Sequence, residues 1–361
     1  MKKLLLLSAL CLLLFFSSIQ SATFSLSENN RVFDGQVSSP FSQSITIYNP
    51  YEDIDFDSVH HYKANLHTHT TESDGSSNVD EVIYQYHDIG NYDILSITDH
   101  SLNTWPWTDW ITENPIDSSS SSAYYPDLNM LAVSGNELSS GHHRSSLLND
   151  YSFGGFFKHF AFWKIQQDNG VSFFNHPGRY TYDANWYQHY FDWFDDCVVG
   201  VEVFNQGDRY SNDRMLWDEI NKQRSPDDLI WGFSNDDMHH LSSHAFRNYQ
   251  HFFMDELTED DLRSAMIDGS FYFSFEPEGA IDSLDTYGKA MTPKLTDVTV
   301  DETTIYLTAE NYTRVEWCDQ YSELIGSTDS LEFSSIDSNF VRAVFSNDFG
   351  KTFTQPFGIQ Q

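Results

Sequence analysis

Cysteines and basic residues are scarce in this sequence, and each shortage excludes a class of protein. The 361 residues include three cysteines and no CxxC pair, so neither a disulfide-rich scaffold nor a thiolate zinc site is expected. Lysine and arginine together number 19 against 54 aspartates and glutamates, which gives a net charge of −35. Because such a surface repels phosphate backbones and no Lys/Arg cluster offsets it, we expect no nucleic acid polymer as a partner.

A long apolar run occurs only at the amino terminus. Two lysines precede an apolar stretch from Leu4 to Phe16, and small and polar residues follow it, which is typical of a secretory signal peptide. The stretch is too short to span a bilayer comfortably, so we expect removal rather than a membrane anchor. Residues 1–22 are therefore predicted to be cleaved near Ser21 or Ala22, leaving a secreted or periplasmic protein with no stable membrane span.

Apolar strands alternate with helices through the middle of the chain. We expect strands at 62–69, 92–100, 128–138, 171–177, 198–205, 229–237 and 270–275, and helices at 78–89, 156–168 and 257–268. Nearly continuous apolar strands of this kind are typical of a parallel sheet covered by helices. At least six of them in about 210 residues favour a closed β/α barrel over an open sheet.

The pattern changes near residue 282, where short strands with polar alternation and frequent turns begin. That pattern predicts a small antiparallel β domain, sandwich-like in form. The predicted organisation is a signal peptide (1–22), a lead-in segment (23–60), an α/β barrel (61–281) and a C-terminal β domain (282–361). We place Cys197 and Cys318 in different domains.

Side chains that bind metals fall at the carboxyl ends of the predicted strands. They are His67, His69, Asp74, His100, Glu137, His142, His143, His176, Asp237 and His239. In a β/α barrel the carboxyl ends of all strands lie on one face, so residues some 170 positions apart would converge there. His67 and His69 are two residues apart and project to the same side of a strand, as do Asp237 and His239. Imidazoles and carboxylates at such spacing suit zinc, manganese or iron.

These residues resemble a known family in an ordered series of motifs. The segments are NLHTHTTESDG, ITDH, GNE, NHPGR and DDMHH. They look like those of the PHP (polymerase and histidinol phosphatase) metallohydrolases, with the closest resemblance to the CehA/McbA-like branch, over about residues 60–275. The resemblance implies a distorted seven-stranded, TIM-like PHP barrel with up to three metals, often followed by a small β domain.

The resemblance also implies a ligand set. His67 and His69 would hold a first metal with Asp237, and Glu137 would bridge it to a second metal. That second metal would be held by His176 and by either His142 or His143. Asp74, His100 and His239 would hold a third.

Residues beside these ligands have proposed supporting roles. Asp99 and Asp236 are candidates for carboxylates that orient ligands, and Asp236 is a tentative catalytic residue. Arg179 or Arg144 would meet an anionic group of the substrate, with Arg179 the tentative catalytic choice.

Two further features stay open on sequence alone. Glu202 could contact a ligand or the substrate, or form an ordinary ion pair. The tryptophans at 105, 107 and 110 either line a substrate pocket or pack over the barrel mouth. The other histidines, His240 and His244 among them, are assigned ordinary structural roles.

Clustered cations lower the pKa of a bridging water and stabilise the charge that develops on attack. We therefore expect a hydrolase that uses a metal-bridged hydroxide on a small-molecule ester, most readily a phosphoesterase. The alternatives are a carboxylic or carbamate ester hydrolase of the same fold, and a secreted binding protein that keeps metals only for stability.

Overall fold

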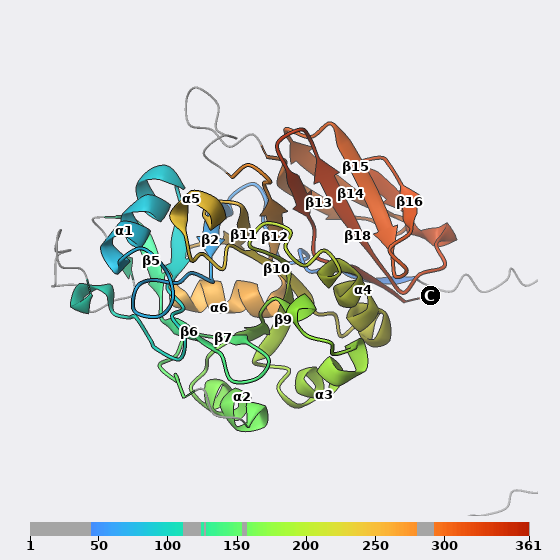
Figure 1. Cartoon of the computed structure of the whole chain (residues 1–361). Coiled ribbons are helices and arrows are strands. Elements are labelled where there is room, and N and C mark those ends of the chain that lie inside the picture. Colours follow the sequence, from blue (N-terminus) through green and yellow to red (C-terminus); the bar gives the residue numbers. More distant parts are fainter. Residues whose placement is uncertain (1–44, 111–123, 126–127, 154–156, 280–291, 361) are drawn as a thin grey trace, which may run out of the picture. The chain divides into compact units, whose positions relative to one another are not determined.

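The computed structural model describes residues 45–110, 124–125, 128–153, 157–279 and 292–360. The predicted signal peptide and most of the predicted lead-in therefore lie outside the described residues. The described residues form a mixed α/β structure (Figure 1).

The strands of the described residues form three sheets. The largest has the strand order β1-β20-β18-β19-β12-β11-β2-β3-β5-β4, with β15 paired to β18 and β16 paired to β15. The second is β10-β9-β8-β7-β6, and the third is β13-β14-β17. The strands of the first half are β1 (Thr46–Tyr48), β2 (His60–Asn65), β3 (Ile94–Ser96), β4 (Tyr124–Tyr125), β5 (Met130–Val133), β6 (Gly135–Leu138), β7 (Arg144–Leu147), β8 (Ser172–Phe174), β9 (Val198–Asn205) and β10 (Trp231–Asn235). The others are β11 (Asn248–Met254), β12 (Phe271–Phe275), β13 (Lys294–Val300), β14 (Thr304–Glu310), β15 (Arg314–Asp319), β16 (Leu324–Gly326), β17 (Ser330–Glu332), β18 (Phe340–Ser346), β19 (Lys351–Phe353) and β20 (Phe357–Gln360).

Parallel pairing occurs in two separate groups of strands. β2, β3 and β5 pair in parallel in the first sheet, and β8, β9 and β10 do so in the second. The hairpin β6–β7 and the strands β11 and β12 are antiparallel to their neighbours. Because the two parallel groups belong to different sheets and no described ladder joins them, the described ladders form open sheets, and a closed seven-stranded barrel is not observed.

The two parallel groups nevertheless approach each other at their carboxyl ends. An isolated parallel bridge joins Thr68, beyond β2, to Met238, beyond β10. A second bridge joins His100, beyond β3, to Glu137 in β6. The ends of strands from both sheets are thereby held in main-chain contact at one place.

The helices pack on these sheets through apolar faces. They are α1 (Val79–Tyr84), continued by a π-helical turn at Gln85–Ile89, α2 (Lys158–Gln167), α3 (Ala184–Trp193), α4 (Asp213–Arg224), α5 (Leu241–His244) and α6 (Glu259–Asp268). The Asn78 side chain caps α1, and Thr258 caps α6, which ends at Gly269 with φ of 76°. One core cluster joins α2, α3 and α4 to β8 and β9 around residues such as Phe162 and Trp217. Residues 184–193 and 213–224 were not predicted as helices.

The carboxyl-terminal strands β13 to β20 all pair antiparallel, as the sequence predicts for this region. β19 also pairs with β12, and β20 pairs with β1, so hydrogen bonding is continuous with the strands before residue 280. The predicted boundary at 281/282 lies within residues 280–291, outside the described residues, and the domain division stays a prediction. Cys197 and Cys318 are free thiols. Among the described residues, no helix is long and apolar enough to cross a membrane.

Candidate metal centre

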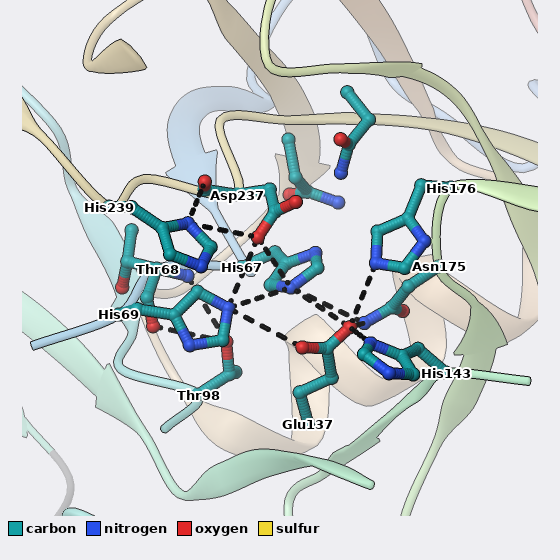
Figure 2. Close-up of polar contacts among 12 residues, drawn as sticks. His67, Thr68, His69, Thr98, Glu137, His143, Asn175, His176, Asp237 and His239 are labelled. Carbon is teal, nitrogen blue, oxygen red and sulfur yellow. Dashed lines mark hydrogen bonds and ion pairs between the residues drawn. The ribbon is translucent and has the colours of Figure 1, made fainter. Parts of the chain in front are cut away.

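Nine of the ten predicted ligands lie together where the carboxyl ends of the two parallel groups meet. Figure 2 shows His67, His69, Glu137, His143, His176, Asp237 and His239 of this set. They are His67 and His69 after β2, Asp74 in the following turn, His100 after β3, Glu137 in β6, His143 before β7, His176 after β8, and Asp237 and His239 after β10. Residues 172 positions apart therefore share one site, as the strand-end pattern predicts.

Three ligand atoms form a compact triangle. His67 Nε2 lies 3.2 Å from His69 Nε2, and these nitrogens lie 3.3 and 3.1 Å from Asp237 Oδ1. Ligands about 2.0–2.1 Å from a tetrahedral ion are roughly 3.3 Å apart, so the triangle has the edge lengths of one face of such a site. Asp237 Oδ1 is buried and has no hydrogen bond in the described part of the structure. An ion at this face would supply the missing partner.

Glu137 lies at the centre of the cluster. Its Oε1 is 2.9 Å from His143 Nδ1, 3.1 Å from His176 Nε2 and 3.4 Å from His67 Nε2. Its Oε2 is 3.0 Å from His100 Nδ1 and 3.5 Å from His69 Nε2. One carboxylate thus faces both the His67–His69 pair and the pair formed by His143 and His176.

Asp74 assembles the third group at the edge of the cluster. Its two oxygens lie 3.3 Å from His239 Nε2, 3.4 Å from His100 Nε2 and 3.7 Å from His69 Nδ1. The Asp74 side chain is 53% exposed, whereas His69 is fully buried. This group is therefore the one most open to solvent.

The three groupings His69-Asp74-His100-His239, His67-His69-Glu137-Asp237 and His100-Glu137-His143 each bring their ligand atoms within 4.8 Å of one another. Imidazole nitrogens with carboxylate oxygens are a donor set that binds zinc, manganese or iron. The residues present therefore fit divalent metal ions.

His142 lies outside the cluster, although it is adjacent to His143. Its Nδ1 is 2.8 Å from the His143 carbonyl, its Nε2 is 2.8 Å from the Tyr187 hydroxyl, and its ring stacks on Tyr180. Burial lowers the pKa of His142 well below its ordinary value. Of the two adjacent histidines, the structure brings His143 to the site.

Unusual backbone conformations shape the loops that carry the ligands. His176 and Asp237 have φ values of 30° and 44°, in the left-handed region that non-glycine residues rarely adopt. A Cβ on Gly75 would lie 2.5 Å from the His69 carbonyl oxygen, so only glycine lets the turn that carries Asp74 approach His69 this closely. Such strain is found where a site requires it.

Glu202 is the carboxylate that supports the ligands. Its Oε1 is 2.8 Å from His67 Nδ1 and accepts a hydrogen bond from Asn235 Nδ2 at 3.1 Å. Its Oε2 accepts from the His176 backbone N–H at 2.8 Å and from Asn205 Nδ2 at 2.9 Å. The bond at Nδ1 leaves His67 Nε2 facing the cluster. The sequence left this role open.

Asp99 and Asp236 do not contact the ligand side chains and instead brace their loops. Asp99 accepts hydrogen bonds from Thr70, Ser73 and Thr104. Asp236 accepts from the Tyr86 hydroxyl and from the backbone of residues 246–248, and burial raises its pKa to about 6. Asp236 is fully buried by these contacts and does not line the cavity, so the geometry does not support the catalytic role suggested for it.

The cluster is strongly charged and buried. Burial alone would raise the pKa of Glu137, but His67 and the hydrogen bonds from the other histidines hold it well below its ordinary value. The pKa of Asp237 is lowered in the same way, against burial, by His67 and His69. Burial lowers the pKa of His67, yet Glu202, Asp237 and Glu137 outweigh it and raise the pKa well above the usual value. The carboxylates are therefore ionised and available as ligands at neutral pH.

A cavity of about 530 Å³ opens over the cluster. Besides Asp74, His100, Glu137, His143, His176, Asp237 and His239, it is lined by Arg179, Gln206, Arg209, His240 and His244. Gln206 and Arg209 are not among the predicted site residues, and His240 and His244 are assigned ordinary structural roles on sequence alone, because nothing in the sequence shows that the turn after β9 and helix α5 border the site.

The structure separates the two arginines proposed to meet an anion. Arg179 is exposed and lines the cavity. Arg144 is fully buried, donates from Nη1 to the carbonyls of Ser140 and His142, and packs on the Phe162 ring. Arg144 is therefore part of the packing behind the site.

The tryptophans after His100 favour the packing alternative. Trp107 is fully buried in a core cluster, and Trp105 and Trp110 pack against that cluster. Trp105 Nε1 donates to the Ala132 carbonyl. None of the three lines the cavity over the ligands.

No family model and no curated protein matches the chain. Among solved structures, the chain is similar to a two-domain protein from Bacteroides vulgatus described as containing a predicted PHP-like metal-dependent phosphoesterase. The sequence identity is 17% and the TM-score 0.47, and the alignment covers 90% of this chain and 92% of that chain. A score below 0.5 at this identity carries no weight by itself, so the function must be inferred from the site.

Proposed function

We propose that this protein is a secreted, metal-dependent hydrolase of the PHP type that cleaves phosphate esters of small molecules. The observation that carries the proposal is the triangle of His67 Nε2, His69 Nε2 and Asp237 Oδ1, with edges of 3.1 to 3.3 Å, beside the carboxylate of Glu137. Two or three divalent ions, of zinc, manganese or iron, would be held by this triangle and by the groups around His143 and Asp74. Bound there, they would activate water and polarise the ester oxygens.

The protein's own residues contribute position and charge. Glu137 faces the ligands of two groupings at once, so one carboxylate would contribute to both groupings. Glu202 orients His67 through Nδ1 and the His176 loop through its backbone N–H. These buried hydrogen bonds keep the donor atoms in place before any ligand arrives.

Arg179 favours a phosphate ester over a neutral carboxylic ester. It lines the cavity and is exposed, and no ion pair in the described part of the chain includes it. A guanidinium can donate two parallel hydrogen bonds to a phosphate, which a carboxylic or carbamate ester would not match. We therefore rank phosphate ester hydrolysis first.

The test uses the purified mature chain. Its metal content is measured, and it is then assayed on 4-nitrophenyl phosphate, bis(4-nitrophenyl) phosphate and 4-nitrophenyl acetate. We expect bound divalent metal and phosphate ester hydrolysis, both lost in the double variant His67→Ala with His69→Ala. The matched control is His60→Ala with His87→Ala, two histidines that line no part of the cavity.

Three results would contradict the proposal. Activity that persists in the His67/His69 variant would place the chemistry elsewhere. Hydrolysis of the acetate alone would favour the carboxylic ester alternative. Bound metal without turnover of any ester would favour the metal-stabilised binding protein. Export is tested separately, by the amino-terminal sequence of the protein recovered outside the cytoplasm, which should begin near Ser21 or Ala22.

A further inference from the structure

Two arginines, Arg179 and Arg209, line the cavity over the cluster. Arg209 is not among the site residues predicted from the sequence. Arg179 follows β8 and Arg209 follows β9, and both are exposed. The protein carries 54 acidic residues, yet in the described ranges no ion pair includes either arginine. By contrast, nearby Arg214 is paired with Asp208 at 2.7 Å. Two unpaired guanidinium groups beside a cavity in so acidic a chain indicate a site for an anion.

Gln206 connects Arg209 to the cluster. Its Oε1 accepts a hydrogen bond from Arg209 Nη1 at 2.7 Å, and its Nε2 donates to the Asp237 carbonyl at 2.9 Å. The same Nε2 lies 3.3 Å from His239 Nδ1. Arg209 is therefore held at a fixed position relative to two of the predicted ligands.

The turn that carries Arg209 is anchored on both sides. Gln206 and Gly207 have φ values of 45° and 78°, and Asn248 exchanges two hydrogen bonds with Gly207, of 2.6 and 3.0 Å. Arg209 also lies over the ring of Tyr210, 5.1 Å from its centroid. A left-handed glutamine is costly unless its surroundings enforce it, so the hydrogen bonds around this turn hold Gln206 in its conformation.

The turns of the two arginines meet. A Cβ on Gly178 would lie 2.8 Å from Tyr210 Cβ, so the segment that carries Arg179 packs directly against the segment that carries Arg209. Figure 2 shows His176, the residue at the start of the first of these segments, beside Asn175 and Glu137. Both arginines thus border the same side of the cavity.

The two arginines differ from the metal-binding residues in depth. Glu137 and Asp237 are at most 4% exposed and line the floor of the cavity, in contact with the fully buried His67 and His69, whereas Arg179 and Arg209 are exposed and line its mouth. An anionic group bound at the floor would leave the mouth for a second group.

We propose that Arg209, positioned by Gln206, is the specificity-determining residue for a second anionic group of the substrate, beside the phosphate ester that Arg179 contacts. The preferred substrates are then phosphate esters that also carry another phosphate or a carboxylate. This inference rests on the proposed function, which places a phosphate ester beside the metal ligands at the floor of the cavity. Binding of the second anionic group can be measured without turnover.

Binding of non-hydrolysable phosphonates tests the proposal without catalysis. Isothermal titration of the metal-loaded full chain compares alkane bisphosphonates of three to six carbons with alkyl monophosphonates of the same length. A charge-assisted hydrogen-bonded pair predicts that at least one bisphosphonate binds about tenfold more tightly than its monophosphonate. ω-Carboxyalkyl phosphonates of the same lengths show whether the second group is better as a carboxylate or a phosphate.

Three variants decide the role of Arg209. Arg209→Ala should abolish most of the preference for two anionic groups, and Arg209→Lys should keep part of it, because the charge stays while the bidentate geometry is lost. Arg214→Ala is the matched control in the neighbouring helix α4 and should keep the full preference, because Arg214 lines no part of the cavity.

The proposal is overturned if the parent protein binds both phosphonate classes equally, or binds neither. It is also overturned if Arg209→Ala keeps the full preference. Absence of ester hydrolysis with an intact preference would instead count against the proposed catalytic function alone, so the two failures are distinguishable.

Discussion

Replacement of Glu202 by glutamine tests how the buried layer behind the ligands controls metal binding. Four donors point at the carboxylate: His67 Nδ1, Asn235 Nδ2, the His176 backbone N–H and Asn205 Nδ2, at 2.8 to 3.1 Å. A carboxylate accepts all four, but an amide has one oxygen and an NH₂ group that itself donates. In Glu202→Gln at least two of the four donors must therefore face another donor.

The neighbours leave little room to adjust. Asn235 cannot turn its amide over, because its Oδ1 already accepts from Leu66 N at 2.9 Å and from Gln250 Nε2 at 2.8 Å. The His176 N–H is a backbone group and cannot change. In the least costly arrangement the oxygen of the new glutamine amide accepts from the His176 backbone N–H, and its NH₂ group faces His67 Nδ1. His67 Nδ1 must then accept a hydrogen bond, which moves the proton of the ring to Nε2. That nitrogen faces the cluster, so the neutral ring could no longer bind a metal through it.

The expected magnitude follows from known losses of this kind. Changes in the partners of metal ligands typically weaken metal binding about 10- to 100-fold, or roughly 1.4 to 2.7 kcal/mol. One buried donor left without an acceptor should also lower the free energy of unfolding by about 1–3 kcal/mol. Chelator competition at buffered free zinc measures the first effect, and chemical denaturation the second.

A matched variant separates the two effects. Asp93 precedes β3 and accepts from the Lys63 backbone N–H at 2.8 Å, at the other end of the strand from His100. Asp93→Asn should lower stability without changing metal affinity. A metal affinity for Glu202→Gln within twofold of the parent would refute the reasoning about the His67 tautomer.

Three further predictions concern neighbouring features. His143→Ala should reduce the bound metal measured by elemental analysis, whereas His142→Ala should lower the thermal midpoint and leave the metal content unchanged; equal metal content in the two variants would contradict the geometry around Glu137. Removal of metal by a chelator should lower the thermal midpoint, because buried carboxylates lose their partners, and this difference should vanish in the His67/His69 double alanine variant. Burial raises the pKa of Asp213 to about 8. The folded chain therefore keeps a proton on this carboxyl that the unfolded chain releases at about pH 4. The free energy of unfolding should therefore fall as pH rises from about 4 to about 8, and Asp213→Asn should remove that part of the slope in a pH series of denaturation curves; an unchanged slope would exclude Asp213 as its cause.

The sequence predicted the gathering of ligands because that inference needs only the ends of strands. His67 and His69 lie just after β2, which ends at Asn65 rather than at the predicted residue 69. Asp237 and His239 lie just after β10, which ends at Asn235 rather than at the predicted residue 237. The carboxyl ends of parallel strands lie at one edge, so the prediction did not depend on whether the sheet closes into a barrel. The order of strands, by contrast, depends on the antiparallel hairpin β6–β7 and on β11 and β12, which local patterns do not reveal.

The choice between His142 and His143 required a register that the sequence does not contain. Glu137 pairs directly with Ser145 across the hairpin, so their side chains lie on the same face. His143 precedes Ser145 by two residues and shares that face, whereas His142 and Arg144 point to the opposite one. One register therefore explains both why His143 reaches Glu137 and why Arg144 is buried on Phe162.

The main chain explains why so many charged groups can be held together in this interior. His69 N donates to the Met238 carbonyl at 2.9 Å, Glu137 N to Thr98 O at 3.1 Å, and Asn175 N to His143 O at 3.1 Å. Each bond joins two segments that carry different ligands, so the positions of the donor atoms follow from the backbone as well as from the attraction between side chains. Buried carboxylates such as Glu137 and Asp237 are costly unless they are paired. A backbone that forces them beside four or more imidazoles keeps them ionised and close, which is the arrangement that a divalent ion requires and that packing alone would not favour.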